Sequence, residues 1–120
     1  MAKLYTFKLD KNKEIFVVKV KGYFEEEDAK LYISEFQTIV NTINPSKYTL
    51  IIDGTEQAPV SSQVMEDIGF VLTVYSMANF KRIIIVNPAS EVSRMQVDSC
   101  VRELNFQGIF VGSVEEAYNL

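Results

Sequence analysis

The sequence predicts an α/β fold: a single domain over residues 1–120 with a mixed, mostly parallel sheet of about five strands and roughly three to four helices. Apolar, strand-like runs alternate with amphipathic helical runs, an order typical of parallel strands joined by right-handed helical crossovers. At the start of the chain, two alternating runs flank a short polar turn, which favours an antiparallel hairpin at the edge of the sheet.

The hairpin is predicted over residues 3–21. Residues 3–10 and 14–21 alternate apolar and polar side chains, which is the pattern of half-buried strands. Residues 11–13, Lys-Asn-Lys, form the turn, and Gly22 ends the second strand. The lysines of this region are interleaved with strand residues and accompanied by acids, which predicts a solvent-exposed face of the hairpin.

A first helix is predicted over residues 24–43. Four acids fill its first turn, where the helix dipole favours negative charge. Because consecutive acids point around a helix instead of converging, they do not predict a metal site. The apolar positions recur at the spacing of one buried stripe: Ala29, Ile33, Phe36, Val40 and Ile43. The sequence Asn-Pro-Ser at 44–46 ends the helix.

Two later runs, 48–53 and 81–86, are almost entirely apolar and predict central strands buried on both faces. A second helix is predicted between them from Ser62 to about Met77, and a third over residues 91–105. Residues 108–111 predict a short last strand. Ser113, with Glu116 three residues later, predicts a capping box that starts a terminal helical turn.

Composition excludes several classes of function. The net charge of -4, with acids spread along the chain, argues against binding to nucleic acid, which needs concentrated Lys and Arg. Since no apolar run approaches membrane-spanning length, membrane insertion is not expected. The single cysteine, Cys100, excludes an internal disulfide and fits a reducing, cytoplasmic location. Its helical neighbours are apolar, which predicts an unreactive thiol.

The chain contains no histidine. This absence removes Ser-His-Asp and Cys-His catalysis, histidine metal ligands and the usual acid-base catalyst near neutral pH. No glycine-rich phosphate loop and no convergent acids are present either. We therefore expect no enzyme activity, and no cofactor or metal is predicted.

The stretch 48–70 is the most informative one for function. A buried strand ends at Asp53, a polar loop follows over residues 54–63, and the pair Ser61 and Ser62 opens a helix. In α/β proteins the loop beyond a strand's carboxyl end is a usual place for ligands and modifications. Asp53 before Gly54 predicts an Asx-type turn. Either serine is expected to cap the helix by accepting hydrogen bonds from free backbone N–H groups.

The order of elements resembles that of the STAS domain, the SpoIIAA-like fold of bacterial anti-sigma factor antagonists and of sulfate-transporter tails. The resemblance covers almost the whole chain. It includes the second strand with its glycine at 17–23, the central strand with its terminal aspartate at 48–53, the serine pair before a helix, and the sequence Gly-Ser-Val-Glu-Glu-Ala at 112–117.

The resemblance implies that Ser62 stands at the position that a partner kinase, itself an anti-sigma factor, phosphorylates in family members that act as switches. That motif reads Asp-Ser-Ser-Gly, whereas this chain has Val60 in place of the aspartate and Gln63 in place of the glycine. The motif is therefore degenerate, and a standard phosphoswitch is not expected. Capping and phosphorylation both remain open for Ser61 and Ser62.

An interaction surface is predicted around this loop. The second helix carries Met65, Phe70, Val74 and Met77 in addition to its buried stripe, and surplus apolar residues indicate either deep burial or a partner. Asp53, Gln63 and Asn87 are expected near the same surface, because each lies beyond or beside the carboxyl end of a strand.

Two functions from different classes follow. The first is a non-enzymatic protein-interaction and signalling module that binds an anti-sigma-like kinase or a larger signalling assembly; self-association is a further option. The alternative is a small-ligand-binding regulatory domain that uses the crevice beside the loop, with Asp53, Ser61, Ser62 and Asn87 as polar contacts.

Overall fold

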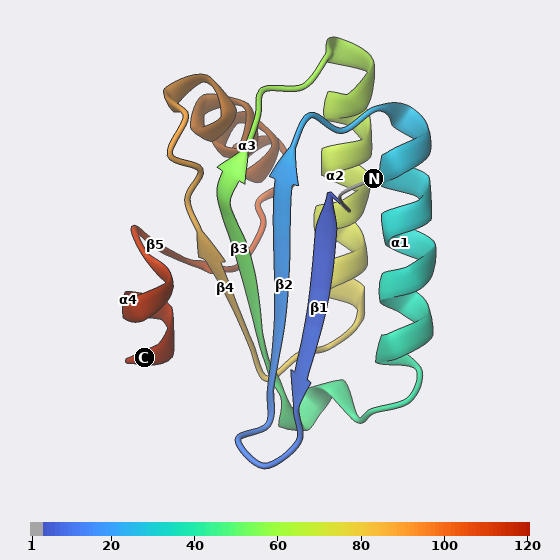
Figure 1. The fold of residues 1–120 in the computed structure, drawn as a ribbon, viewed down its shortest axis with the longest axis vertical. Coiled ribbons are helices and arrows are strands. Elements are labelled where there is room, and N and C mark those ends of the chain that lie inside the picture. The colour runs from blue at the N-terminus through green and yellow to red at the C-terminus, as the bar shows by residue number, and fades with distance from the viewer. Residues whose placement is uncertain (1–3) are drawn as a thin grey trace.

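A five-stranded sheet in the order β1-β2-β3-β4-β5 organises residues 4–120, the part of the chain that this computed structural model describes (Figure 1). The strands are β1 (Tyr5–Asp10), β2 (Ile15–Gly22), β3 (Thr49–Gln57), β4 (Arg82–Val86) and β5 (Ile109–Val111). β1 pairs with β2 antiparallel, and every later pair is parallel. The predicted mixed sheet with an antiparallel hairpin at its edge is confirmed. Lys3, where the first strand was predicted to start, lies outside the described residues.

The helices cover the two faces of the sheet unequally. They are α1 (Glu26–Val40), a short 3₁₀ helix (Pro45–Lys47), α2 (Ser62–Met77), α3 (Glu91–Leu104) and α4 (Val114–Tyr118). α1, α2 and α3 contribute to the larger core, whereas α4 packs on the other face against β4 and β5. In Figure 1, α1 and α2 stand side by side and α4 lies apart from them near β5.

β3 and β4 are central strands, as their apolar sequences predicted. Residues 49–53 of β3 pair in parallel with residues 82–86 of β4. Successive side chains of a strand point to opposite faces, and here Leu50 and Ile52 enter the larger core while Ile51 enters the smaller one. β3 therefore ties both cores together.

The extent of β3 corrects one prediction, because the strand continues past Asp53 to Gln57. The reason is that β2 is long enough to pair with this extension, Lys21 opposite Glu56 and Gly22 opposite Gln57, after a register shift between Lys19 and Lys21. An ion pair of 2.6 Å between Lys19 Nζ and Glu56 Oε2 joins the same two strands. The predicted loop over residues 54–63 is thus confined to residues 58–61.

Helix ends also differ from the sequence prediction. α1 begins at Glu26, two residues later than predicted, because Phe24 is buried in the core and Glu25 takes the extended N-cap conformation. Glu25 and Asp28 form a full capping box there. The box predicted at Ser113 is only half formed: Ser113 caps α4, but the Glu116 carboxylate accepts from the Gly112 N–H.

None of the helices in the described part of the chain combines the length and the apolar character that crossing a bilayer requires.

Ile51→Asp is expected to prevent folding, since Ile51 is only 1% exposed and an uncompensated buried charge costs about 3–5 kcal/mol or more. Thr6→Asp, at an exposed position of β1, is the matched control and is expected to leave the unfolding midpoint nearly unchanged. Thermal unfolding followed by circular dichroism measures both. A soluble Ile51→Asp protein that melts cooperatively would show that β3 is not buried on both faces.

Candidate functional site

Asp53 shapes the backbone near the middle of β3, where β4 ends. Its Oδ1 atom accepts hydrogen bonds from the Thr55 backbone N–H at 3.2 Å and from the Thr55 hydroxyl at 2.7 Å. The Asx-type turn predicted for Asp53 is therefore present, although it lies within the extended strand. On the neighbouring strand, Val86 pairs with Asp53 and is followed directly by Asn87. The pairing of β3 with β4 thus brings Asp53 next to the segment that contains Asn87.

α3 holds the segment 57–60 that leads from β3 to α2. The Ser93 hydroxyl donates to the Gln57 carbonyl at 3.0 Å, and Ser93 is buried. Gln96 makes two bonds to Val60: its Nε2 donates to the carbonyl at 2.9 Å, and its Oε1 accepts from the backbone N–H at 3.0 Å. The Ala58 N–H also donates to the Gly22 carbonyl at 3.0 Å. This segment is therefore held from both sides.

Sequence reasoning missed Ser93 and Gln96. Their spacing of three residues places both on one side of the third helix, and Val97 and Cys100 are buried beside them. Polar side chains beside a buried stripe usually hydrogen-bond to backbone groups inside the fold, and this is the signal that could have found Ser93 and Gln96. The partner segment itself could not be read from this spacing.

Ser61 and Ser62 have different roles. Ser61 is the N-cap of α2, and its hydroxyl accepts from the Val64 N–H at 3.4 Å. Ser62 is the first helical residue and is exposed, and within residues 4–120 its hydroxyl makes no hydrogen bond. The prediction that a serine of this pair caps the helix is confirmed for Ser61 but not for Ser62, which already has helical backbone geometry.

The other predicted site residues divide between surface and core. Gln63 is exposed beside Ser62, and Phe70 and Met77 are 57% and 75% exposed on the outer side of α2. Phe70 lies eight residues after Ser62, about 12 Å further along the helix. Met65 instead packs against the larger core, on the side of α2 that faces Cys100 of α3. The exposed predicted residues therefore form a strip along α2 without Met65.

Asn87 is half-buried beyond the end of β4. Its backbone N–H donates to the Val111 carbonyl at 2.9 Å, but its side-chain Oδ1 is buried without a hydrogen-bond partner in the described part of the chain. Buried acceptors are usually paired. The end of β4 thus keeps an unused acceptor next to the Asp53 turn.

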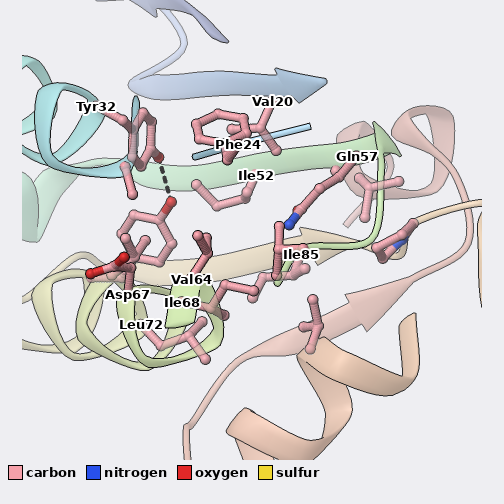
Figure 2. A pocket seen from close by; sticks show the side chains of 18 residues that line it. Val20, Phe24, Tyr32, Ile52, Gln57, Val64, Asp67, Ile68, Leu72 and Ile85 are labelled. Carbon is pink, nitrogen blue, oxygen red and sulfur yellow. Dashed lines mark hydrogen bonds between the residues drawn. The ribbon is translucent and has the colours of Figure 1, made fainter. Parts of the chain in front are cut away.

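A cavity of about 90 Å³ lies between α1, α2 and the sheet (Figure 2). Its walls are almost entirely apolar, with Ile52 and Ile85 on the sheet side and Val64 and Ile68 on the α2 side. Val60 also lines it. The segment that α3 holds therefore forms part of the cavity wall. Asp53, Ser61, Ser62 and Asn87, predicted as polar contacts of a small ligand, do not line this cavity.

Two tyrosines bridge α1 and α2 at the cavity. The hydroxyl groups of Tyr32 and Tyr75 hydrogen-bond to each other, as the dashed line in Figure 2 marks. Burial raises the pKa of both hydroxyls above the ordinary tyrosine value. Both groups therefore stay protonated and uncharged at neutral pH.

Asp67 is the one ionisable carboxylate that lines the cavity. Its Oδ2 atom is buried and has no hydrogen-bond partner among residues 4–120. Burial raises the pKa of this carboxyl above its ordinary value of 3.8, and the charge of Glu26 raises it further, while Lys30 acts in the opposite direction. The charged form of Asp67 is therefore destabilised in the fold.

Reactive groups are few. Cys100 is buried, and burial raises the pKa of its thiol, which lowers the fraction of reactive thiolate at neutral pH. Among the side chains that the structure describes, no three acidic or cysteine residues gather into a group that could hold a metal ion. The site consists of exposed polar and apolar contacts beside an apolar cavity.

Comparison with solved structures identifies the fold. An uncharacterized protein from Shewanella loihica, described as having a SpoIIAA-like fold, superposes with a TM-score of 0.66 at 16% identity, over 96% of this chain and 90% of that one. An anti-sigma factor antagonist from Mycobacterium paratuberculosis gives 0.63 at 14% identity, over 96% and 92%. SpoIIAA in its unphosphorylated form gives 0.61 at 12% identity, over 96% and 94%.

The chain has the SpoIIAA-like fold. No protein-family model matches the sequence, and no curated protein matches it significantly. The STAS-like architecture expected from the order of elements is thereby confirmed at the level of the fold.

The position of Val60 bears on one departure from the expected phosphorylation motif. Val60, which the resemblance set against the aspartate of that motif, is buried with its side chain on the cavity wall. A charged side chain at this position would place an anion against apolar residues. An apolar residue at position 60 therefore matches the cavity.

Asp67→Asn is expected to stabilise the protein at pH 7. Because the folded-state pKa of Asp67 is raised, the free energy of unfolding of the wild type falls as pH rises from below about 3.8 through that raised value. Asparagine at position 67 does not ionise, so the variant does not lose this stability as pH rises. Urea unfolding of both proteins at about pH 3 and pH 7 measures the effect. The stability advantage of Asp67→Asn should be larger at pH 7; an equal difference at both pH values would contradict the assignment.

Proposed function

We propose that this protein is a non-enzymatic, cytoplasmic interaction module of the anti-sigma factor antagonist type. Its partner would be an anti-sigma-like kinase or a signalling assembly that contains one. The observation that carries this proposal is the exposed start of α2, with the free Ser62 hydroxyl beside Gln63, on a SpoIIAA-like fold. Two of the similar structures are anti-sigma factor antagonists.

The rigidity of the segment before α2 supports a preformed binding surface. Three side-chain hydrogen bonds from Ser93 and Gln96 hold residues 57–60. A surface that is ordered before binding loses less conformational entropy on association. The partner would therefore meet Ser62 and Gln63 in a fixed position.

The outer side of α2 supplies apolar contact area. Phe70 and Met77 are largely exposed on this helix, and Val74 is partly exposed between them. Aromatic and methionine side chains are enriched in protein interfaces. We place the interface on a strip from Ser62 and Gln63 along α2 to Phe70 and Met77. This strip leaves out three residues of the predicted surface: Asp53, Met65 and Asn87.

Ser62 is the position at which a modification would act. Its hydroxyl is free and exposed, whereas the Ser61 hydroxyl is engaged in the cap. A phosphate at the first helical residue would sit at the positive end of the helix dipole. It would add negative charge at one end of the proposed interface without removing the cap of α2.

Ser62→Asp is expected to abolish binding and Ser62→Ala to preserve it, with both proteins as stable as the wild type. The readout is affinity capture from a lysate of the source organism, followed by identification of the bound proteins. The wild type and Ser62→Ala should retain the same kinase-like ATPase, and Ser62→Asp and Phe70→Asp should lose it. Ser34→Asp, at an exposed position of α1, is the matched control and should keep it.

Ser61→Ala separates capping from binding. Loss of the cap should cost about 1 kcal/mol of stability while the captured protein stays the same. Equal capture by all variants, or no kinase-like partner with the wild type, would refute the proposed interface.

A further inference from the structure

A second pocket, of about 240 Å³, lies at the end of the sheet where β2, β3 and β4 begin, beside α4. The first residues of these strands, Ile15, Thr49 and Arg82, pair side by side and all line it. Figure 1 shows the turn between β1 and β2 and the segment before β3 at this end of the sheet, whereas α2 begins at the opposite end. The pocket shares no residue with the proposed interface on α2.

Cationic side chains gather around this pocket, although the whole chain carries a net charge of -4. The lining includes four of them, from three separate segments: Lys13, Lys47, Lys81 and Arg82. Within the described residues, Glu14 is the one acidic side chain of the lining. Positive charge remains in excess even when the main-chain carboxylate of the last residue, Leu120, is counted as a second anion. A hollow lined by one sign of charge concentrates ions of the opposite sign, so this pocket attracts anions.

The cations of the pocket are available to a ligand. None of the four forms an ion pair with an Asp or Glu side chain within residues 4–120. Arg82 donates from Nη2 to the Leu120 carbonyl at 3.2 Å, which orients the guanidinium and leaves its other N–H groups free to donate. A guanidinium can hold two oxygens of a carboxylate or phosphate through parallel hydrogen bonds, whereas a lysine acts as a point charge.

Backbone hydrogen bonds join the segments that carry these cations. The Lys81 N–H donates to the Tyr48 carbonyl at 3.0 Å and to the Pro45 carbonyl at 3.3 Å. The Thr49 N–H donates to the Glu14 carbonyl at 3.0 Å, which ties the hairpin turn to the start of β3. The cationic segments are therefore held together before any ligand binds, and this reduces the entropic cost of binding.

Thr49 adds a buried polar contact to the pocket. It is only 8% exposed, and it shares the sheet face of Ile51, because side chains alternate along a strand. Its hydroxyl makes no hydrogen bond within residues 4–120. In that part of the chain, the side-chain polar atoms sealed from solvent without a partner belong to Asp67 and Asn87, so the Thr49 hydroxyl is not sealed. A hydroxyl that lines a cationic pocket can donate to an anion.

We propose that this pocket binds a phosphate monoester group, with Arg82 on two of its oxygens and the Thr49 hydroxyl on the third. Lys13, Lys47 and Lys81 supply further positive charge around it. A phosphate monoester carries about 1.5–2 negative charges at neutral pH and has three strong acceptor oxygens, which matches a pocket rich in donors and cations. The same group occurs on soluble metabolites and on lipid headgroups. Its binding is independent of the partner proposed for α2.

Titration of isotope-labelled protein with glycerol 3-phosphate, glycerol and acetate at constant ionic strength tests the proposal by two-dimensional NMR. Glycerol 3-phosphate should shift the signals of Thr49, Ile51 and Ala117, which line the pocket. Acetate should bind at least about tenfold more weakly, because it carries a single charge, and glycerol should not bind. No shifts with glycerol 3-phosphate, or equal binding of acetate, would overturn the proposal.

Vesicles of phosphatidylcholine with and without phosphatidic acid distinguish the two sources of the group. If the protein binds glycerol 3-phosphate and also sediments with the phosphatidic acid vesicles, the source is a lipid headgroup. If it binds glycerol 3-phosphate and stays in solution, the source is a soluble metabolite. Sedimentation without any response to glycerol 3-phosphate would overturn the pocket, because it would show only general attraction to an anionic surface.

Three variants locate the site. Arg82→Gln should weaken binding of glycerol 3-phosphate about tenfold, because charge-assisted hydrogen bonds are lost. Arg94→Gln, the matched control at an exposed position of α3 outside the pocket, should change it by less than about twofold, since salt screens distant charges. Thr49→Val keeps the shape and charge of the site and should weaken binding about fivefold.

Thermal unfolding midpoints equal to that of the wild type would show that these variants are folded. Equal weakening by Arg82→Gln and Arg94→Gln would overturn the proposal, because it would show non-specific attraction. Unchanged affinity in Thr49→Val would overturn the contact assigned to its hydroxyl.

Discussion

The burial of β3 on both of its faces is the constraint on which the rest of the structure depends. β3 lies between two parallel neighbours, and its side chains alternate between a large core under α1, α2 and α3 and a small core under α4. Because β3 and β4 are parallel, they must be joined by a crossover that returns along one face of the sheet, and α2 therefore follows the carboxyl end of β3. This connection places the start of the proposed interface, at Ser62 and Gln63, beyond the end of β3, and the strip then runs back along α2 to Met77.

β3 is also longer than β4, its neighbour on one side. β4 ends at Val86, opposite Asp53, whereas Glu56 and Gln57 of β3 continue to pair with β2, and the Thr55 carbonyl accepts from the Ala89 N–H beyond β4. At Gln57 the chain leaves the sheet, and α3 then holds it. The side chains of Ser93 and Gln96 hydrogen-bond to the backbone of Gln57 and Val60. Val60 then contributes to two features, since its backbone is part of the held segment and its side chain lines the cavity.

The sequence was sufficient for the architecture because the signals that define it are local or periodic. The apolar runs of β3 and β4 and the alternation in the hairpin reflect burial directly. The end of β3 was misjudged because Gly54, Thr55 and Glu56 are typical loop residues, and only the partner strand shows that they extend the sheet. Similarly, the choice of Ser61 over Ser62 as the cap depends on backbone geometry that two adjacent serines cannot reveal.

The candidate site was less predictable than the fold. Ser62, Gln63 and Phe70 are exposed, in agreement with a surface role, but Met65 is packed inward. The binding of Val60 by Gln96 and the position of Asp67 on a cavity wall are tertiary contacts between distant segments, 36 residues apart in the first case. Periodicity cannot report such contacts, because it describes one element at a time.

The central claim of this account is that the segment before α2 is held by α3 and not mobile. Amide hydrogen exchange of the Val60 N–H tests it most directly, since among residues 4–120 this group donates only to Gln96 Oε1. The account predicts that this amide is strongly protected in the wild type and loses its protection in Gln96→Ala, while the amides of Leu50 and Ile52 in β3 stay protected. Exchange of the wild-type Val60 amide at the rate of an unfolded peptide would contradict it.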